Sequence, residues 1–215
     1  MAYFVPASYG EAEFVEKRSR FIGQVWPIES VEQAKELLSG VKAKYYDARH
    51  NCWCYILRGD GPGGAEAVRY ADDGEPQGTA GQPMLEVFRR AGIENVLCVV
   101  TRYFGGILLG AGGLTRAYAH TAKLALDAAG IAEMRLWTCL EIVCPYGLLE
   151  RVKNEIEVFG GRIERTDYGV DVTLGALFPE KDLPLFETGL ADMTSGAVTG
   201  VVTGVKYVAV ISGNT

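Results

Sequence analysis

A glycine-rich stretch between Tyr103 and Arg116 holds the residue types best suited to chemistry. Its five glycines are Gly105, Gly106, Gly110, Gly112 and Gly113. They follow an apolar segment and precede one with helical spacing, so backbone N–H groups and a helix N-terminus could face an anion together. Arg102 and Arg116 flank the stretch, and guanidinium groups bind phosphate oxygens in a bidentate way. The pattern predicts an anion- or nucleic-acid-binding site made of Arg102, the five glycines and Arg116.

Known phosphate-binding loops match this stretch only in part. Gly105 and Gly110 have the spacing of a P-loop, but Ala111 stands where the phosphate-binding lysine belongs. The run that starts at Gly110 also lacks the third glycine of the dinucleotide fingerprint. The glycines could instead permit tight turns and close helix–sheet packing. The residues alone leave both interpretations open.

An acidic cluster, Asp72, Asp73 and Glu75, precedes the glycine-rich stretch. Its spacing fits no calcium loop, and no His or Cys aligns with it. We therefore predict that these carboxylates cap a turn and face solvent. They are also alternative ion-pair partners for Arg102 and Arg116, which competes with an anion-binding role for the two arginines.

The densest basic cluster is Lys17, Arg18 and Arg20. We predict an extended segment from Phe14 to Ile28, which places Arg18 and Arg20 on one side of a strand. The cluster is a secondary candidate for contact with nucleic acid. Alternatively, charges on an edge strand discourage edge-to-edge pairing.

The cysteines and histidines offer no clear catalytic set. The cysteines are Cys52, Cys54, Cys98, Cys139 and Cys144, and none forms a C-x-x-C pair. We predict that they are reduced and mostly buried. His50 lies two positions before Cys52 on an expected strand, a spacing that does not usually allow a close side-chain bond. We assign no catalytic residue, no metal ligand and no cofactor; whether the chain is an enzyme stays open, with a non-catalytic role favoured.

Composition and charge narrow the class of protein. The chain has 215 residues, 48% of them hydrophobic, and a net charge of −6, so it can build a core without disulfides or metal. The acidic total repels a polyanion at long range, and nucleic-acid contact needs a local basic patch. The longest uncharged stretch near the glycines, from Tyr103 to Thr115, is too short to span a bilayer. With no secretory signal at the N-terminus, we predict a cytoplasmic protein.

Hydrophobic periodicity predicts an α+β protein of two domains. In residues 1–132 we expect strands at Cys52–Leu57, Ala67–Ala71 and Val96–Val100. We also expect a helix capped by Ser30 and Gln33, a helix that follows Pro83, and a helix from Leu114 to an αL cap at Gly130.

The second predicted domain covers residues 137–215, after a junction at Gly130–Leu136. It reads strand, helix, strand, strand, helix, strand, which is the ferredoxin-like order. Trp137–Cys144 is its expected first strand. Apolar residues stand at every second position of Val170–Phe178, namely Val170, Val172, Leu174, Ala176 and Phe178, and Val198–Ile211 is expected to close the sheet.

Three motifs resemble the IMPACT/YigZ family. They are Asp72–Gly81 (DDGEPQGTAG), Thr101–Gly106 (TRYFGG) and Leu109–Tyr118 (LGAGGLTRAY), and the run His50–Cys52 is also similar to that family. The resemblance covers the whole first domain. The second domain resembles the ferredoxin-like C-terminal domain of the bacterial members, with weaker motifs.

The resemblance implies a first domain with the fold of domain IV of elongation factor G. The eukaryotic relatives regulate translation under stress, and for bacterial members a ribosome- or RNA-associated role is implied by fold analogy. No catalytic residues come with the family. We therefore expect a non-catalytic, translation-associated regulator that binds RNA, the ribosome or a translation-linked protein. The alternatives are an enzyme or sensor for a small phosphorylated ligand at the Gly105–Arg116 loop, and a purely protein–protein regulator.

Overall fold

The structure is a computed structural model that describes residues 2–59 and 65–211. Contacts divide the chain into two compact units. One contains Tyr3–Glu133 together with residues 210 and 211, and the other contains Met134–Ala209 together with Ala2. Each unit has its own apolar core. The two sheets and five helices give the mixed α+β architecture that the sequence predicts.

The first unit is built on a five-stranded antiparallel sheet in the order β2-β3-β6-β4-β5. Its strands are β2 (Gly10–Glu16), β3 (Ser19–Pro27), β4 (His50–Leu57), β5 (Ala67–Ala71) and β6 (Val96–Tyr103). The central strand β6 is buried along nearly its whole length. It extends past the expected end at Val100, and so includes Arg102.

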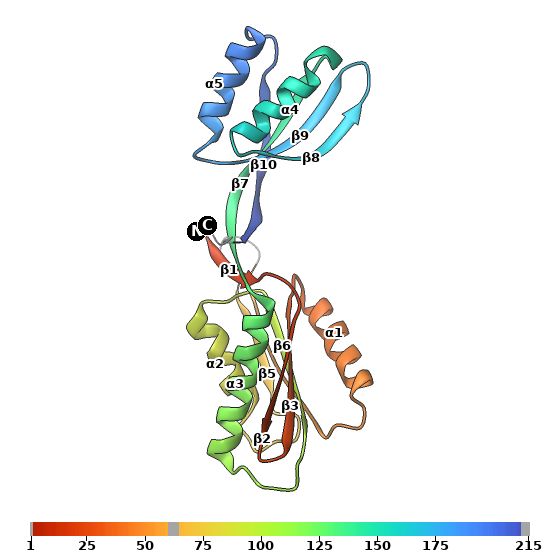
Figure 1. Cartoon of the computed structure of the whole chain (residues 1–215), viewed down its shortest axis with the longest axis vertical. Coiled ribbons are helices and arrows are strands. Elements are labelled where there is room, and N and C mark those ends of the chain that lie inside the picture. Colours follow the sequence, from red (N-terminus) through yellow and green to blue (C-terminus); the bar gives the residue numbers. More distant parts are fainter. Residues whose placement is uncertain (1, 60–64, 212–215) are drawn as a thin grey trace. The chain divides into compact units, whose positions relative to one another are not determined.

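Helices cover both faces of this sheet (Figure 1). They are α1 (Val31–Lys44), α2 (Gly81–Ala91) and α3 (Ala111–Ala129). Side chains alternate along a strand: Leu97 and Val99 of β6 pack in one core cluster with α1. Cys98 and Val100 pack with α2 and α3 in the other.

The predicted start of α1 is confirmed. Ser30 is the N-cap, and its side chain accepts a hydrogen bond from the Gln33 backbone N–H at 3.1 Å. The Gln33 side chain bonds back to the Glu29 N–H at 2.7 Å, one residue earlier than in a standard capping box.

The expectation of one extended segment from Phe14 to Ile28 is wrong. Lys17 and Arg18 have φ values of 45° and 64°, and Glu16 pairs directly with Ser19. Positive φ at both central residues is the signature of a tight two-residue hairpin turn. Arg18 therefore lies in the turn and does not share a strand face with Arg20.

Helix α3 begins three residues earlier than Leu114, at Ala111. Gly112 and Gly113 are therefore helical residues and not part of the preceding loop. The helix ends at Gly130 as expected, but its φ of 70° and ψ of 174° differ from the predicted αL cap.

The second unit has the predicted βαββαβ order. Its elements are β7 (Ile131–Cys144), η1 (Tyr146–Leu148), α4 (Leu149–Val158), β8 (Arg162–Tyr168), β9 (Val172–Pro179), α5 (Leu183–Thr194) and β10 (Gly200–Ile211). The strands are ordered β10-β7-β9-β8. β1 (Tyr3–Pro6), which belongs to the first unit, also pairs with β7, whose start at Ile131 lies in that unit. Residues of α4 and α5 pack against alternate residues of β7 and β9.

Two boundaries in this region differ from expectation. The first strand starts at Ile131 and not at Trp137, so the junction segment Gly130–Leu136 is mostly strand. Val170 lies before β9 and is 98% exposed, although its position continues the apolar alternation. The predicted domain limits near this segment stay a prediction, for proteolysis to test.

Burial of the cysteines is confirmed for Cys52, Cys54, Cys98 and Cys144, whereas Cys139 is half-buried. Among the described residues, no helix has both the length and the apolar character needed to cross a bilayer.

Candidate functional site

Arg102 forms a buried ion pair at the end of β6. Its Nη1 lies 2.6 Å from Oε1 of Glu75, and both side chains are at least nine-tenths buried. Oε1 also accepts a hydrogen bond from the Tyr118 hydroxyl at 2.7 Å, while Arg102 Nη2 donates to Ser19 Oγ at 3.3 Å. Of the ion-pair partners that the sequence left open, Glu75 is the one that the structure brings to Arg102. The Nε of Arg102 has no hydrogen-bond partner among the described residues.

The acidic cluster divides into different roles. The Asp72 carboxylate accepts hydrogen bonds from the N–H groups of Gly78, Ala80 and Gly81 at 2.7, 3.0 and 2.9 Å, at the start of α2. Asp73 accepts from the Asn51 backbone N–H. The turn-capping prediction is therefore confirmed for Asp72. It is wrong for Glu75, which is buried and not solvent-facing.

Tight turns account for several of the glycines. A Cβ on Gly105 would lie 2.0 Å from the backbone carbon of Arg18, so this glycine lets the loop pack on the β2–β3 turn. Gly106 and Gly110 have φ values of 85° and 73°, which side chains rarely tolerate. The structure supports the turn and packing interpretation at these three positions.

The N-terminus of α3 opens onto the same end of the sheet. The N-cap is Gly110, which has no side chain to cap the helix, and no acidic residue occupies the first turn. The first N–H groups of a helix have no intrahelical acceptor and favour an anion. Arg116 follows within the second turn, exposed, and its guanidinium lies 3.5 Å from where a Gly112 Cβ would stand.

A hollow of about 350 Å³ joins these elements. Its lining comes from β4, β6, the turn after β5, the loop before α3 and α3 itself, and consists of Arg49, His50, Glu75, Pro76, Arg102, Phe104, Leu108, Leu109, Gly110, Ala111 and Leu114. Of the seven residues of the predicted anion site, Arg102 and Gly110 line it, beside the α3 N-terminus. Gly105, Gly106, Gly112, Gly113 and Arg116 do not line it.

Sequence reasoning missed Arg49 and the apolar wall of this hollow. Arg49 is exposed and precedes His50, which pairs with Arg102 across the β4–β6 register. Phe104 and Leu108 are 50% and 82% exposed. The aromatic Phe104 directly before Gly105 and Gly106 was the signal available in the sequence for the wall, whereas Arg49 is placed there only by the strand register.

The secondary basic patch lies next to the same loop. Figure 1 shows the β2–β3 turn and the β6–α3 loop at the same end of the first unit. Lys17 and Arg18 are exposed in the turn. Arg20 instead pairs with Glu13 at 2.7 Å, which neutralises it. Two of the three predicted cations are therefore free of ion pairs with described residues.

The chemistry of the cysteines and histidines argues against a nucleophile at this end. Burial raises the pKa of the Cys52 thiol to about 12, so it stays protonated at neutral pH. Its Sγ donates to the Asp72 carbonyl at 2.9 Å, and His50 Nδ1 contacts the Asp73 carbonyl. Burial likewise raises the pKa of the Tyr118 hydroxyl well above its usual range. His120 packs edge-on against Phe14.

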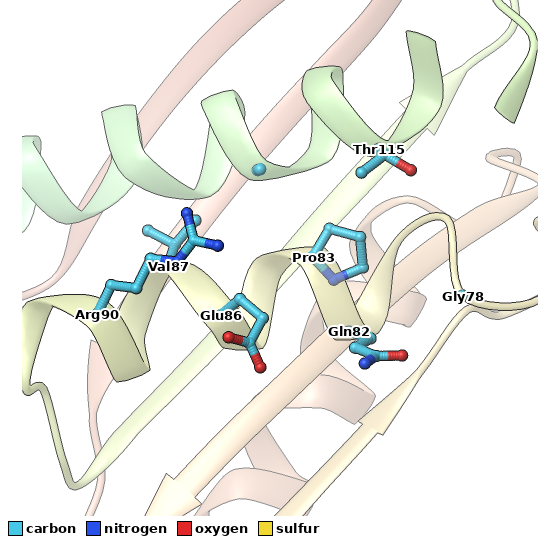
Figure 2. Close-up of a pocket in the computed structure, with 8 residues that line it drawn as sticks. Gly78, Gln82, Pro83, Glu86, Val87, Arg90 and Thr115 are labelled. Carbon is cyan, nitrogen blue, oxygen red and sulfur yellow. The ribbon is translucent and has the colours of Figure 1, made fainter. Parts of the chain in front are cut away.

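A separate groove of about 430 Å³ runs between α2 and α3. Figure 2 shows Pro83 and the Arg90 guanidinium directed toward α3, while the Glu86 carboxylate points away from it. Such a lining offers no convergent polar set. Within residues 2–59 and 65–211, no group of three or more His, Cys, Asp or Glu side chains is placed to hold a metal ion.

Fold and site define an α+β protein of two compact units, the first of which carries a glycine-rich loop before α3. Residues 17–126 match the Impact N-terminal domain, and residues 142–197 match a domain of unknown function, DUF1949. The chain belongs to the IMPACT family.

Full-length relatives support this assignment. IMPACT family member YvyE of Bacillus subtilis (strain 168) is 34% identical over 196 residues, which is 91% of this chain and 88% of YvyE. IMPACT family member YigZ of Escherichia coli (strain K12) is 35% identical over 182 residues, covering 85% of this chain and 88% of YigZ. A solved structure described as a crystal structure of a hypothetical protein is 33% identical, covers 94% of this chain and 97% of its own, and has a TM-score of 0.59.

Proposed function

We propose that this protein is a non-catalytic, translation-associated regulator whose first unit binds RNA. The binding surface is the end where the β2–β3 turn, the β6–α3 loop and the α3 N-terminus lie. One observation carries the proposal: four exposed cations, Lys17, Arg18, Arg49 and Arg116, have no ion pair with described residues there.

For a phosphate close to this surface, the nearby charged side chains matter more than the net charge of −6 of the whole chain. Salt screens charges beyond about 8–10 Å, so a phosphate at this surface responds mainly to nearby groups. Arg20 is neutralised by Glu13 and Arg102 by Glu75. Two carboxylates of the same region keep their charge: Asp47, which accepts a hydrogen bond from the neutral Tyr103 hydroxyl at 2.6 Å, and Glu16, which precedes the turn and has no ion pair with the described residues. The four unpaired cations remain for phosphate contacts, which dominate nucleic-acid affinity.

The link to translation rests on the family. The resemblance implies that eukaryotic relatives act on translation, and RNA is the ligand in that process that an array of unpaired arginine and lysine side chains fits best. Burial keeps the Cys52 thiol protonated at neutral pH, which argues against this residue as a nucleophile.

Fluorescence polarisation with a labelled single-stranded RNA tests the proposal. We compare the double variant Arg49→Ala/Arg116→Ala with a control, Lys35→Ala/Arg90→Ala, which removes two exposed cations outside the hollow, one early in α1 and one in the last turn of α2. The first variant should lose about tenfold or more in affinity per contact. Its slope of log K against log salt should fall by about 1.4. Equal losses in both double variants, or no binding at low salt, would contradict the proposal.

A second candidate is a small phosphorylated ligand at the Gly105–Arg116 loop. The hollow of about 350 Å³ beside the uncapped α3 N-terminus favours it. Its volume falls within the range of roughly 300–1,000 Å³ typical of small-molecule sites. Titration with a free nucleotide separates this candidate from RNA binding.

A further inference from the structure

The hollow that Arg49, Phe104 and the α3 N-terminus line combines an apolar wall with an anion-binding end. Helix α3 spans Ala111–Ala129, and its first N–H groups are uncapped. Arg102 lines the same hollow and is 6% exposed; its Nη1 is paired with Glu75, which also lines the hollow, and its Nε has no partner among the described residues. Arg49 adds an exposed cation without an ion pair to the described residues. The first N–H groups of α3 and the Arg49 guanidinium can together bind one phosphate.

A phosphate alone does not account for the rest of the lining. Phe104 is half-exposed, and its ring lies 5.6 Å from the guanidinium carbon of Arg102. Leu108, also in the lining, is 82% exposed. Nucleobases stack on aromatic rings irrespective of sequence. A ring next to a guanidinium is therefore a platform for a planar base, and it lines the same hollow as Gly110 and Ala111 at the start of α3.

The size of the hollow limits what can enter. A volume of about 350 Å³ suits one nucleotide unit and not a helical duplex. Bases inside a duplex are stacked on their neighbours, so only an unpaired base can reach Phe104.

We propose that this hollow receives one unpaired nucleotide, with its base on Phe104 and its phosphate at the α3 N-terminus and Arg49. This inference rests on the proposed RNA-binding role. The same nucleotide unit could belong to an RNA strand or be a free mononucleotide, and the experiment distinguishes the two sources.

The experiment is a polarisation titration with the full chain. The probes are a labelled twelve-nucleotide single-stranded RNA, a labelled blunt duplex of the same strand, and labelled AMP, each titrated directly. The variant Phe104→Leu keeps the site apolar but removes the ring. Its control is Tyr70→Leu on β5, which removes an aromatic side chain of similar exposure, 47% against 50%, outside the hollow.

We expect Phe104→Leu to weaken single-strand binding by roughly 5- to 100-fold, with an unchanged salt slope. Duplex binding and the Tyr70→Leu variant should show no such loss. A second variant, Ala111→Asp, places a carboxylate at the α3 N-terminus. It should weaken binding at least about tenfold without lowering the melting temperature, because an acidic residue there stabilises the helix while it occupies the anion site. A loss caused by misfolding would instead lower the melting temperature.

The outcomes separate the inference from the proposed function. Equal binding of single strand and duplex, unaffected by Phe104→Leu, overturns the nucleotide inference and leaves the RNA-binding role standing. Binding of AMP but not RNA, sensitive to Phe104→Leu, overturns the RNA role and supports the nucleotide site. If none of the three probes binds, both the RNA-binding role and the nucleotide site are overturned.

Discussion

Neutralising Glu75 is the sharpest test of the interior of this site. In the unchanged protein, Arg102 Nη1 and the Tyr118 hydroxyl oxygen lie 2.6 and 2.7 Å from Glu75 Oε1. In the variant Glu75→Gln the amide oxygen can still accept hydrogen bonds from both groups. The negative charge is lost, however, and the Arg102 guanidinium stays buried at 6% exposure without compensation. Breaking a buried pair in this way costs about 3–5 kcal/mol.

The expected shift in melting temperature follows from the size of the unit. For a domain of this size 1 kcal/mol corresponds to roughly 3–5 °C, so the first unit should melt roughly 10–25 °C lower in Glu75→Gln. Circular dichroism and the fluorescence of Trp26 and Trp53, both in the first unit, report the transition.

A matched control separates burial from pairing. The Arg20–Glu13 pair has nearly the same length, 2.7 Å, but its side chains are 52% and 46% exposed. Glu13→Gln should therefore cost less than about 1 kcal/mol. If Glu75→Gln and Glu13→Gln melt within a few degrees of each other, the argument from burial is refuted.

Three further predictions concern the same unit. Gly105→Ala should destabilise it because the new Cβ would meet the Arg18 backbone at 2.0 Å, whereas Gly40→Ala in α1, with nothing within 4 Å, should stabilise it by roughly 0.5–1 kcal/mol in urea unfolding. Asp72→Ala removes the acceptor of three backbone N–H groups and should cost about 2–4 kcal/mol, measured the same way. The unfolding free energy should fall as the pH rises from about 9 to 12, because the buried Cys52 thiol has a pKa of about 12 when folded but 9.0 when unfolded. Cys52→Ala should reduce the slope of unfolding free energy against pH by up to ~1.4 kcal/mol per pH unit, and an unchanged slope would contradict the assignment.

Local patterns were enough to predict most elements of the fold. Ser30 and Gln33 identify the start of α1, and the βαββαβ order of the second unit follows from its alternating apolar residues. The turn at Lys17 and Arg18 was not predictable in this way, because two cations with positive φ carry none of the glycine or asparagine signals of such turns. The sheet holds them there through the β2–β3 register.

The site was predicted in outline and not in its electrostatics. Its glycines and flanking arginines are visible as spacing. The choice between Asp72, Asp73 and Glu75 as partner of Arg102 depends on how the turn after β5 folds onto β6, which is a long-range contact. Arg49 joins the hollow only through the pairing of β4 with β6.

Photo-cross-linking to a single-stranded RNA that carries 4-thiouridine, followed by mass spectrometry, tests the central claim most directly. The account predicts cross-linked peptides from the β6–α3 loop around Phe104 and from the β2–β3 turn. The yield of these peptides should fall in Arg49→Ala/Arg116→Ala. Cross-links confined to Met134–Ala209, or spread evenly over both units, would contradict it.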